Sequence, residues 1–171
     1  MVSSPIRIFL LVTLLTMLLA QPVFATEMAP LFHGTALNTG QQIRLEDYRG
    51  KVVLVDFWAS WCPPCLTSLP AYNQMRRELG SSEFEIIAIN VDENTEDGLS
   101  FLDEHPVDYP VLADPLGKIG IPYGIRTLPR AFLLDREGRI TATFKSYRAG
   151  DEEKIKQQIK RLTVRRPAAM D

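Results

Sequence analysis

Cysteine is scarce in this chain, with only Cys62 and Cys65 in 171 residues. Small secreted domains that depend on disulfides for stability carry more cysteines and space them far apart. A disulfide scaffold is therefore excluded, and the 46% of hydrophobic residues are enough to build one ordinary core. Because the two cysteines are only three positions apart, we interpret the pair as chemical rather than architectural.

A large excess of charge is also lacking, since the formal net charge is −2. Nucleic-acid-binding proteins normally present a strongly basic surface, so no nucleic-acid partner is expected. Histidine is equally rare, and His33 and His105 are isolated in the sequence. They do not combine with the cysteines into the four ligands of a zinc site. We therefore expect no metal and no cofactor other than a redox-active cysteine pair.

The sequence has no apolar segment of the length that crosses a bilayer comfortably. The run Ile8–Ala20 has 13 residues, whereas about 20 are needed. Arg7 precedes it, and Val23-Phe24-Ala25 follows with the small-residue pattern read by signal peptidase. We predict a signal peptide over residues 1–25, with an uncleaved membrane anchor as the alternative. Residues 26–171 then form a domain outside the cytoplasm, with its core at about 45–164.

The pattern of apolar runs predicts an α/β domain. Val52–Trp58 is a continuous β-branched and aromatic run, typical of a strand buried on both faces. A helix from about Pro64 to Leu79 and a second buried strand over Glu85–Val91 complete a βαβ unit. Before this unit we predict a loose hairpin within residues 26–50. After it we predict a helix that is capped by Thr95 and runs to about His105, a short extended piece at 109–112 and helical turns at 116–123. The last predicted elements are a hairpin of 131–134 with 140–144 and a helix over 151–164.

The sequence Trp61-Cys62-Pro63-Pro64-Cys65 lies where the first strand meets the helix. The first turn of a helix has unpaired N–H groups and the positive end of the dipole, so a thiol there ionises more readily. Cys62 is the predicted exposed attacking thiolate, and Cys65 is the buried thiol that resolves a mixed disulfide. Pro63 and Pro64 stiffen the loop. A structural disulfide is the weaker alternative, because a loop this short stabilises little.

Asp56 and Pro129 are the next candidates. Asp56 interrupts the apolar strand, and its burial would raise its pKa towards the range in which it exchanges protons with Cys65. The alternative is a solvent-facing acid on an edge strand. Pro129 precedes a predicted strand, where proline requires a special turn. The Leu128–Pro129 bond can be cis, which would let the Leu128 backbone pair with an extended substrate, or trans, as most such bonds are.

These residues resemble the thioredoxin superfamily and its exported TlpA/ResA-like branch, over about residues 45–162. The matching motifs are Val55-Asp56-Phe57-Trp58-Ala59, Trp61-Cys62 through Cys65, Pro70, Tyr123–Pro129, and Phe132–Asp135 with Gly138. The resemblance implies a thioredoxin-like three-layer sandwich: a central mixed β-sheet with helices on both faces. It also implies an α/β insertion between the second core strand and a cis-proline at Pro129.

The resemblance further implies a periplasmic thiol–disulfide oxidoreductase. Its substrates would be exported proteins with cysteines, including apocytochromes c awaiting haem, and a membrane electron donor of thiol-reductase type would keep the dithiol reduced. Trp61 would flank the active surface. Arg130, where threonine usually follows the cis-proline, would add a positive charge near Cys62. Ser68 stands where many exported relatives carry glutamate, so Asp56 would be the sole buried acid.

Three alternatives to a reductase remain at this point. The same dithiol serves an oxidase or isomerase, because the direction of exchange depends on the reduction potential. A peroxidase normally uses a different cysteine motif, so antioxidant activity is not expected. A non-catalytic binding module with a regulatory dithiol would keep its activity without the cysteines, but the sequence shows no second apolar domain.

Overall fold

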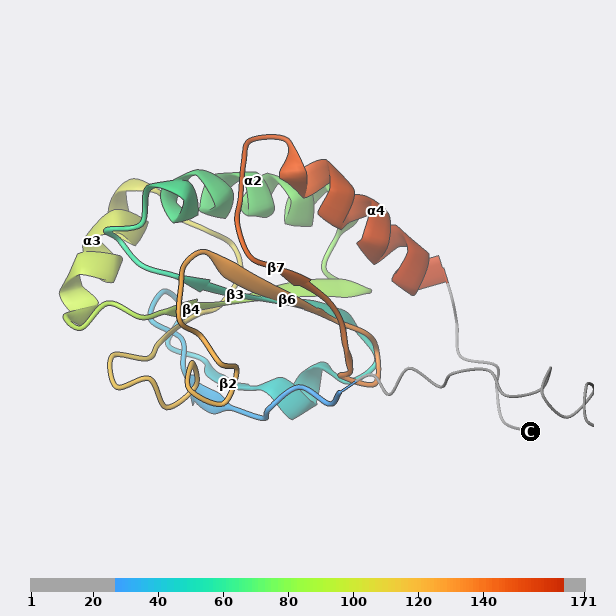
Figure 1. Cartoon of the computed structure of the whole chain (residues 1–171), viewed down its shortest axis with the longest axis horizontal. Coiled ribbons are helices and arrows are strands. Elements are labelled where there is room, and N and C mark those ends of the chain that lie inside the picture. Colours follow the sequence, from blue (N-terminus) through green and yellow to red (C-terminus); the bar gives the residue numbers. More distant parts are fainter. Residues whose placement is uncertain (1–26, 165–171) are drawn as a thin grey trace, which may run out of the picture.

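A computed structural model describes residues 27–164. The predicted signal segment lies outside the described residues and stays a prediction. The centre is a five-stranded sheet in the order β5-β4-β3-β6-β7 (Figure 1). Its strands are β3 (Val52–Trp58), β4 (Phe84–Asn90), β5 (Val111–Ala113), β6 (Arg130–Leu134) and β7 (Ile140–Phe144). β3, β4 and β5 run parallel, whereas β6 is antiparallel to both β3 and β7, so the sheet is mixed as predicted.

Three α-helices pack on one face of this sheet (Figure 1). They are α2 (Pro63–Leu79), α3 (Thr95–Glu104) and α4 (Asp151–Val164). Their buried apolar side chains include Leu69, Tyr72, Met75, Leu102, Ile155 and Ile159. Within residues 27–164, none of the helices combines the length and the apolar character that crossing a membrane requires.

The opposite face has a different cover. It carries the hairpin of β1 (His33–Thr35) and β2 (Gln42–Arg44), the short 3-10 helix η1 (Leu45–Tyr48), and a turn-rich segment around Ile119 and Tyr123. The three layers of the thioredoxin-like fold are therefore confirmed, but the helical part of this second face is only the four-residue η1. Phe32, Ile43 and Leu45 are buried in the core cluster on this face.

The strand β3 lies between β4 and β6 and separates the two core clusters. All seven of its residues are buried. Side chains alternate along a strand, so Leu54 and Trp58 pack with the helices while Val55 and Phe57 pack against the opposite layer. The same alternation places Asp56 on the helix face.

The predicted α/β insertion is present as α3 and β5, between β4 and Pro129. The helix cap differs from the prediction, because Asn94 rather than Thr95 is the N-cap residue. The Asn94 side chain accepts a hydrogen bond from the Glu96 N–H at 3.3 Å. The predicted helical turns at 116–123 are a series of hydrogen-bonded turns, including bonds from Ile121 N–H to the Gly117 carbonyl and from Ile125 N–H to the Gly120 carbonyl.

Candidate active site

The two cysteines lie at the junction of β3 and α2. Cys62 is the N-cap residue of α2, and its carbonyl accepts hydrogen bonds from the N–H groups of Cys65 and Leu66. Pro63 occupies the first helical position, where its missing N–H costs nothing because that group has no partner within the helix. Cys62 and Cys65 form a disulfide with a Cα–Cα distance of 5.3 Å. Both cysteines therefore lie at the N-terminus of α2, Cys62 as the N-cap residue and Cys65 in the first turn.

The two cysteine residues differ slightly in their exposure to solvent. Cys65 is fully buried, whereas Cys62 is 4% exposed. Cys62 is therefore buried in this disulfide form, and the prediction that it is exposed is wrong for this form. Trp61, immediately before it, is 67% exposed. Cys62 is thus the less buried member of the pair, and it directly follows the exposed indole of Trp61.

Asp56 lies on the central strand and is 1% exposed, which excludes the edge-strand alternative. Burial raises the pKa of its carboxyl well above the usual range. Among the described residues, neither of its oxygens has a hydrogen-bond partner. Its charge also adds to burial in raising the pKa of the Tyr72 and Tyr109 hydroxyls, so these groups lie near it.

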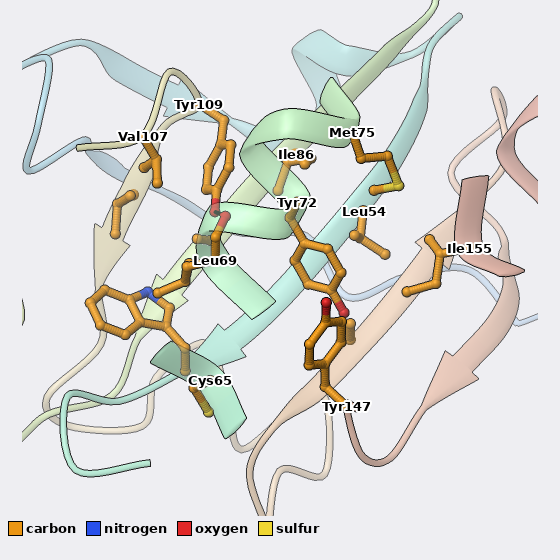
Figure 2. Close-up of a cluster of buried hydrophobic side chains, with 14 of the residues drawn as sticks. Leu54, Cys65, Leu69, Tyr72, Met75, Ile86, Val107, Tyr109, Tyr147 and Ile155 are labelled. Atoms are coloured by element: carbon orange, nitrogen blue, oxygen red, sulfur yellow. Dashed lines mark hydrogen bonds between the residues drawn. The ribbon is translucent and has the colours of Figure 1, made fainter. Parts of the chain in front are cut away.

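Asp56 faces the side of the sheet that α2 covers, because it alternates along β3 with Val55 and Phe57 of the opposite layer. Figure 2 shows Cys65, Leu69 and Tyr72 following one another along α2. Both cysteines and these side chains belong to one core cluster. Asp56 therefore shares the helix-side core with Cys65, and an apolar lining surrounds them both.

The bond between Leu128 and Pro129 is cis. Leu128 is half-buried and packs against the core cluster that contains both cysteines. Arg130 begins β6, and its Nε is buried without a partner among the described residues. Strand alternation puts Arg130 on the face of Phe132, opposite to the face of Cys65. Its effect on the charge of the dithiol stays a prediction.

A groove of about 560 Å³ runs beside Trp61. Its walls come from the loop after β4 and from the segment that leads to the cis-proline. The lining includes Trp61, Val91, Glu93, Pro115, Ile121, Arg126 and Leu128. Ile121 is 74% exposed, which is unusual for a large apolar side chain. Sequence reasoning missed Ile121, because no periodicity in a turn-rich segment indicates which apolar residues stay exposed.

Asp114 shapes one wall of this groove and was also missed. It is 4% exposed, and its Oδ2 accepts hydrogen bonds from the N–H groups of Ile119 at 3.0 Å and Gly120 at 2.7 Å. The sequence carries no signal for this role beyond an aspartate before a glycine-containing turn. Within the described part of the chain, no group of three or more His, Cys, Asp or Glu side chains could hold a metal ion.

A cysteine pair that caps a helix above a buried carboxyl, on a sheet of this strand order, is the arrangement of thioredoxin-like redox proteins. The family model described as Redoxin matches residues 24–159. The chain therefore belongs to the Redoxin family, and within the thioredoxin superfamily it is a ResA/TlpA-like protein.

Named relatives agree with this assignment. Thiol-disulfide oxidoreductase ResA of Bacillus thuringiensis subsp. konkukian is 33% identical over 135 residues, which cover 79% of this chain and 76% of the relative. The crystal structure of a protein described as thiol:disulfide interchange protein DsbE from Chlorobium tepidum has a TM-score of 0.75 and 36% identity, and covers 81% of this chain and 96% of that one. The protein is a thiol–disulfide oxidoreductase.

Proposed function

We propose that this protein is an exported reductase that transfers two electrons from its Cys62–Cys65 dithiol to disulfides of exported proteins. The observation that carries the proposal is the cysteine pair at the start of α2, in which Cys62 is the less buried member and Cys65 lies in the core on the side of the sheet that the buried acid Asp56 also faces. The names of the relatives support redox exchange in general. The class of substrate, the direction of electron transfer and the exported location of the protein are our proposal.

The exchange proceeds in two balanced steps. The Cys62 thiolate attacks one sulfur of the substrate disulfide, which forms a mixed disulfide and releases the other substrate sulfur as a thiolate. Cys65 then attacks the Cys62 sulfur. The Cys62–Cys65 bond forms, the mixed disulfide breaks, and the second substrate sulfur leaves as a thiol. The structure has the oxidised form of this couple.

We assign Asp56 the role of proton acceptor for Cys65 in the second step, a role that its carboxyl fills in the ionised form. Cys65 is fully buried, so solvent does not reach its thiol, and only the thiolate attacks. The raised pKa of the Asp56 carboxyl brings it closer to the pKa of a thiol, which favours proton transfer between the two groups.

The signal-like segment at residues 1–25 supports an exported location, and we propose the periplasm. In that oxidising compartment the dithiol needs a continuous supply of electrons. A membrane electron donor of thiol-reductase type meets this need. The substrates are exported proteins with cysteines, and apocytochromes c awaiting haem are one such class.

Cysteine variants test the dithiol directly. Cys62→Ser is expected to abolish turnover of a protein disulfide, because the attacking sulfur is lost. Cys65→Ser is expected to accumulate a covalent mixed disulfide with the substrate, because nothing resolves it. Non-reducing electrophoresis and mass spectrometry detect this adduct. Turnover that persists in Cys62→Ser would rule out the proposed mechanism.

An oxidase or isomerase is the second candidate. A solution structure of a protein described as a protein disulfide isomerase from Bacteroides thetaiotaomicron is 32% identical to this chain, with a TM-score of 0.72, and it covers 84% of this chain and 92% of that one. The two candidates differ in the reduction potential of the couple. We expect a value near that of thioredoxin, about −270 mV, and a value near about −120 mV would support the oxidase instead.

A further inference from the structure

We propose that Asp92 is a positioning residue for the dithiol, because its carboxylate holds the turn that presents Cys62 to substrates. The proposal rests on the proposed function in taking Cys62–Cys65 as the reacting couple. Asp92 lies just after β4, is 1% exposed, and is 30 positions from Cys62 in the sequence.

The turn in question joins β3 to α2. The Cys62 N–H donates to the Ala59 carbonyl at 3.1 Å, so Ser60 and Trp61 are the two central residues of a β-turn. The direction of this turn decides where the indole of Trp61 and the sulfur of Cys62 lie. A short turn of this kind needs an external anchor if its direction is to be constant.

Asp92 supplies this anchor. The Ser60 N–H donates to both carboxylate oxygens, at 3.1 and 3.0 Å, and the Ser60 hydroxyl donates to Oδ1 at 3.1 Å. Hydrogen bonds to an ionised acceptor are stronger than those between neutral groups. One main-chain bond, from the Val91 N–H to the Trp58 carbonyl at 2.9 Å, lies beside this contact and joins the same two loops.

The anchor is itself held by the sheet. Asn90, the last residue of β4, is fully buried, and its Nδ2 donates to Asp92 Oδ2 at 2.7 Å while its Oδ1 accepts from the Asp92 N–H at 3.3 Å. The inserted helix α3 closes over this pair, since a Cβ added at Gly98 would lie 2.7 Å from the Asn90 side chain. The contacts therefore run from α3 through Asn90 and Asp92 to Ser60, two residues before Cys62.

Within residues 27–164, the Asp92 carboxylate accepts hydrogen bonds from the Ser60 N–H, the Ser60 hydroxyl and the Asn90 amide. An asparagine at position 92 would turn an NH₂ group towards at least one of them. The turn would then hold Cys62 within bonding reach of Cys65 for less of the time. The intramolecular disulfide would lose part of its advantage from proximity.

The test is the equilibrium of the full chain with glutathione. In this equilibrium the Cys62–Cys65 bond breaks, two glutathione molecules give up two electrons, and their sulfurs form the bond of glutathione disulfide. We expect Asp92→Asn to favour the dithiol form about tenfold more than the wild type, which is about 30 mV for a two-electron couple. Ser60→Ala removes one hydrogen bond but keeps the carboxylate, so a shift of about threefold in the same direction is expected.

Asp135→Asn is the matched control. The Asp135 carboxylate also accepts backbone N–H bonds, from Glu137 and Arg139, but it does so in the β6–β7 hairpin at the opposite end of β3. We expect this variant to lose stability without a change in the glutathione equilibrium.

The possible outcomes distinguish positioning of the Ser60–Trp61 turn from an effect of the Asp92 charge and from a general loss of stability. An unchanged equilibrium in Asp92→Asn overturns the proposal, and so does a shift in Asp92→Asn without one in Ser60→Ala, which would assign the effect to charge. An equal shift in Asp135→Asn overturns it as well. If Asp92→Asn fails to fold, Ser60→Ala decides alone. A wild-type chain that shows no reversible couple would instead refute the proposed function.

Discussion

At the scale of single residues, Asp56 shows how this fold keeps a reactive group at the expense of stability. A carboxyl that is buried without a hydrogen bond is destabilising in its charged form. Neither Asp56 oxygen has a partner among the described residues, and burial raises its pKa well above the usual range. Its position in the sheet is therefore better explained by the chemistry of Cys65 than by folding.

Asp56→Asn is expected to be more stable than the wild type at pH 7. The native chain releases the Asp56 proton at a higher pH than the unfolded chain, which releases it at about pH 4, so the wild type loses stability as the pH rises from about 4 towards the folded pKa. The amide cannot titrate, so the gain in stability is expected at pH 7 and should shrink to near zero at about pH 3–4. Urea unfolding of the oxidised protein at both pH values measures it.

The exposed Asp103 offers a control for this measurement. Asp103→Asn should change the free energy of unfolding by less than about 0.5 kcal/mol at either pH. If Asp56→Asn gained the same stability at pH 4 and at pH 7, titration of the buried carboxyl would not be the cause. Turnover should fall in Asp56→Asn even though its stability rises.

At the scale of elements, the inserted helix α3 depends on its N-cap. Asn94 caps the helix with its side chain, and Asp97 in the first turn lies favourably at the positive end of the helix dipole. The sequence Asn94-Thr95 contains two good capping residues in a row. Propensity alone does not choose between them, because both side chains can accept a hydrogen bond from the first turn.

The structure makes this choice testable. Asn94→Ala is expected to lower the free energy of unfolding by about 1 kcal/mol, because the Glu96 N–H loses its acceptor. Thr95→Ala should have a much smaller effect, since alanine is a good residue inside a helix. Denaturant unfolding of both variants gives the comparison. A larger loss in Thr95→Ala than in Asn94→Ala would contradict the assigned cap.

At the scale of the whole molecule, the groove beside the dithiol is assembled from segments far apart in the sequence. Trp61 comes from the β3–α2 turn, Glu93 from the loop after β4, and Ile121 from the turns before the cis-proline. Trp61 and Ile121 are both mostly exposed. We predict that a protein substrate buries these apolar surfaces during the exchange and that a small reagent does not.

Ile121→Ser is therefore expected to lower kcat/KM for a protein disulfide roughly fivefold, which corresponds to about 1 kcal/mol of lost apolar contact. It should leave turnover of a small aromatic disulfide and the reduction potential unchanged. Leu31→Ser is the control, because Leu31 is an exposed apolar residue that is 60% accessible and outside the groove lining. An equal loss in both variants, or a loss with the small reagent, would argue against the groove as a substrate surface.

Several elements were predictable because their signals are local. The buried strand Val52–Trp58, the helix that starts at the cysteine pair and the hairpin that follows Pro129 appear at or within a residue or two of their predicted bounds. Apolar runs, prolines and glycine turns act on their immediate neighbours, so sequence reasoning captures them. The buried state of Asp56 was predictable for the same reason, since its apolar flanks leave it no solvent-facing side.

The remaining features depend on contacts between distant segments. No pattern indicated that Asp92 would bond to Ser60, that Asp114 would hold the groove wall, or that turns and η1 would cover the second face of the sheet. The sequence by itself determined the class of protein, because a cysteine pair between a buried strand and a helix defines its own chemistry. Only the tertiary structure decided how the cysteine pair is oriented and which groove lies next to Trp61. The reason is that hydrogen bonds and packing across the sheet join residues that no sequence spacing connects.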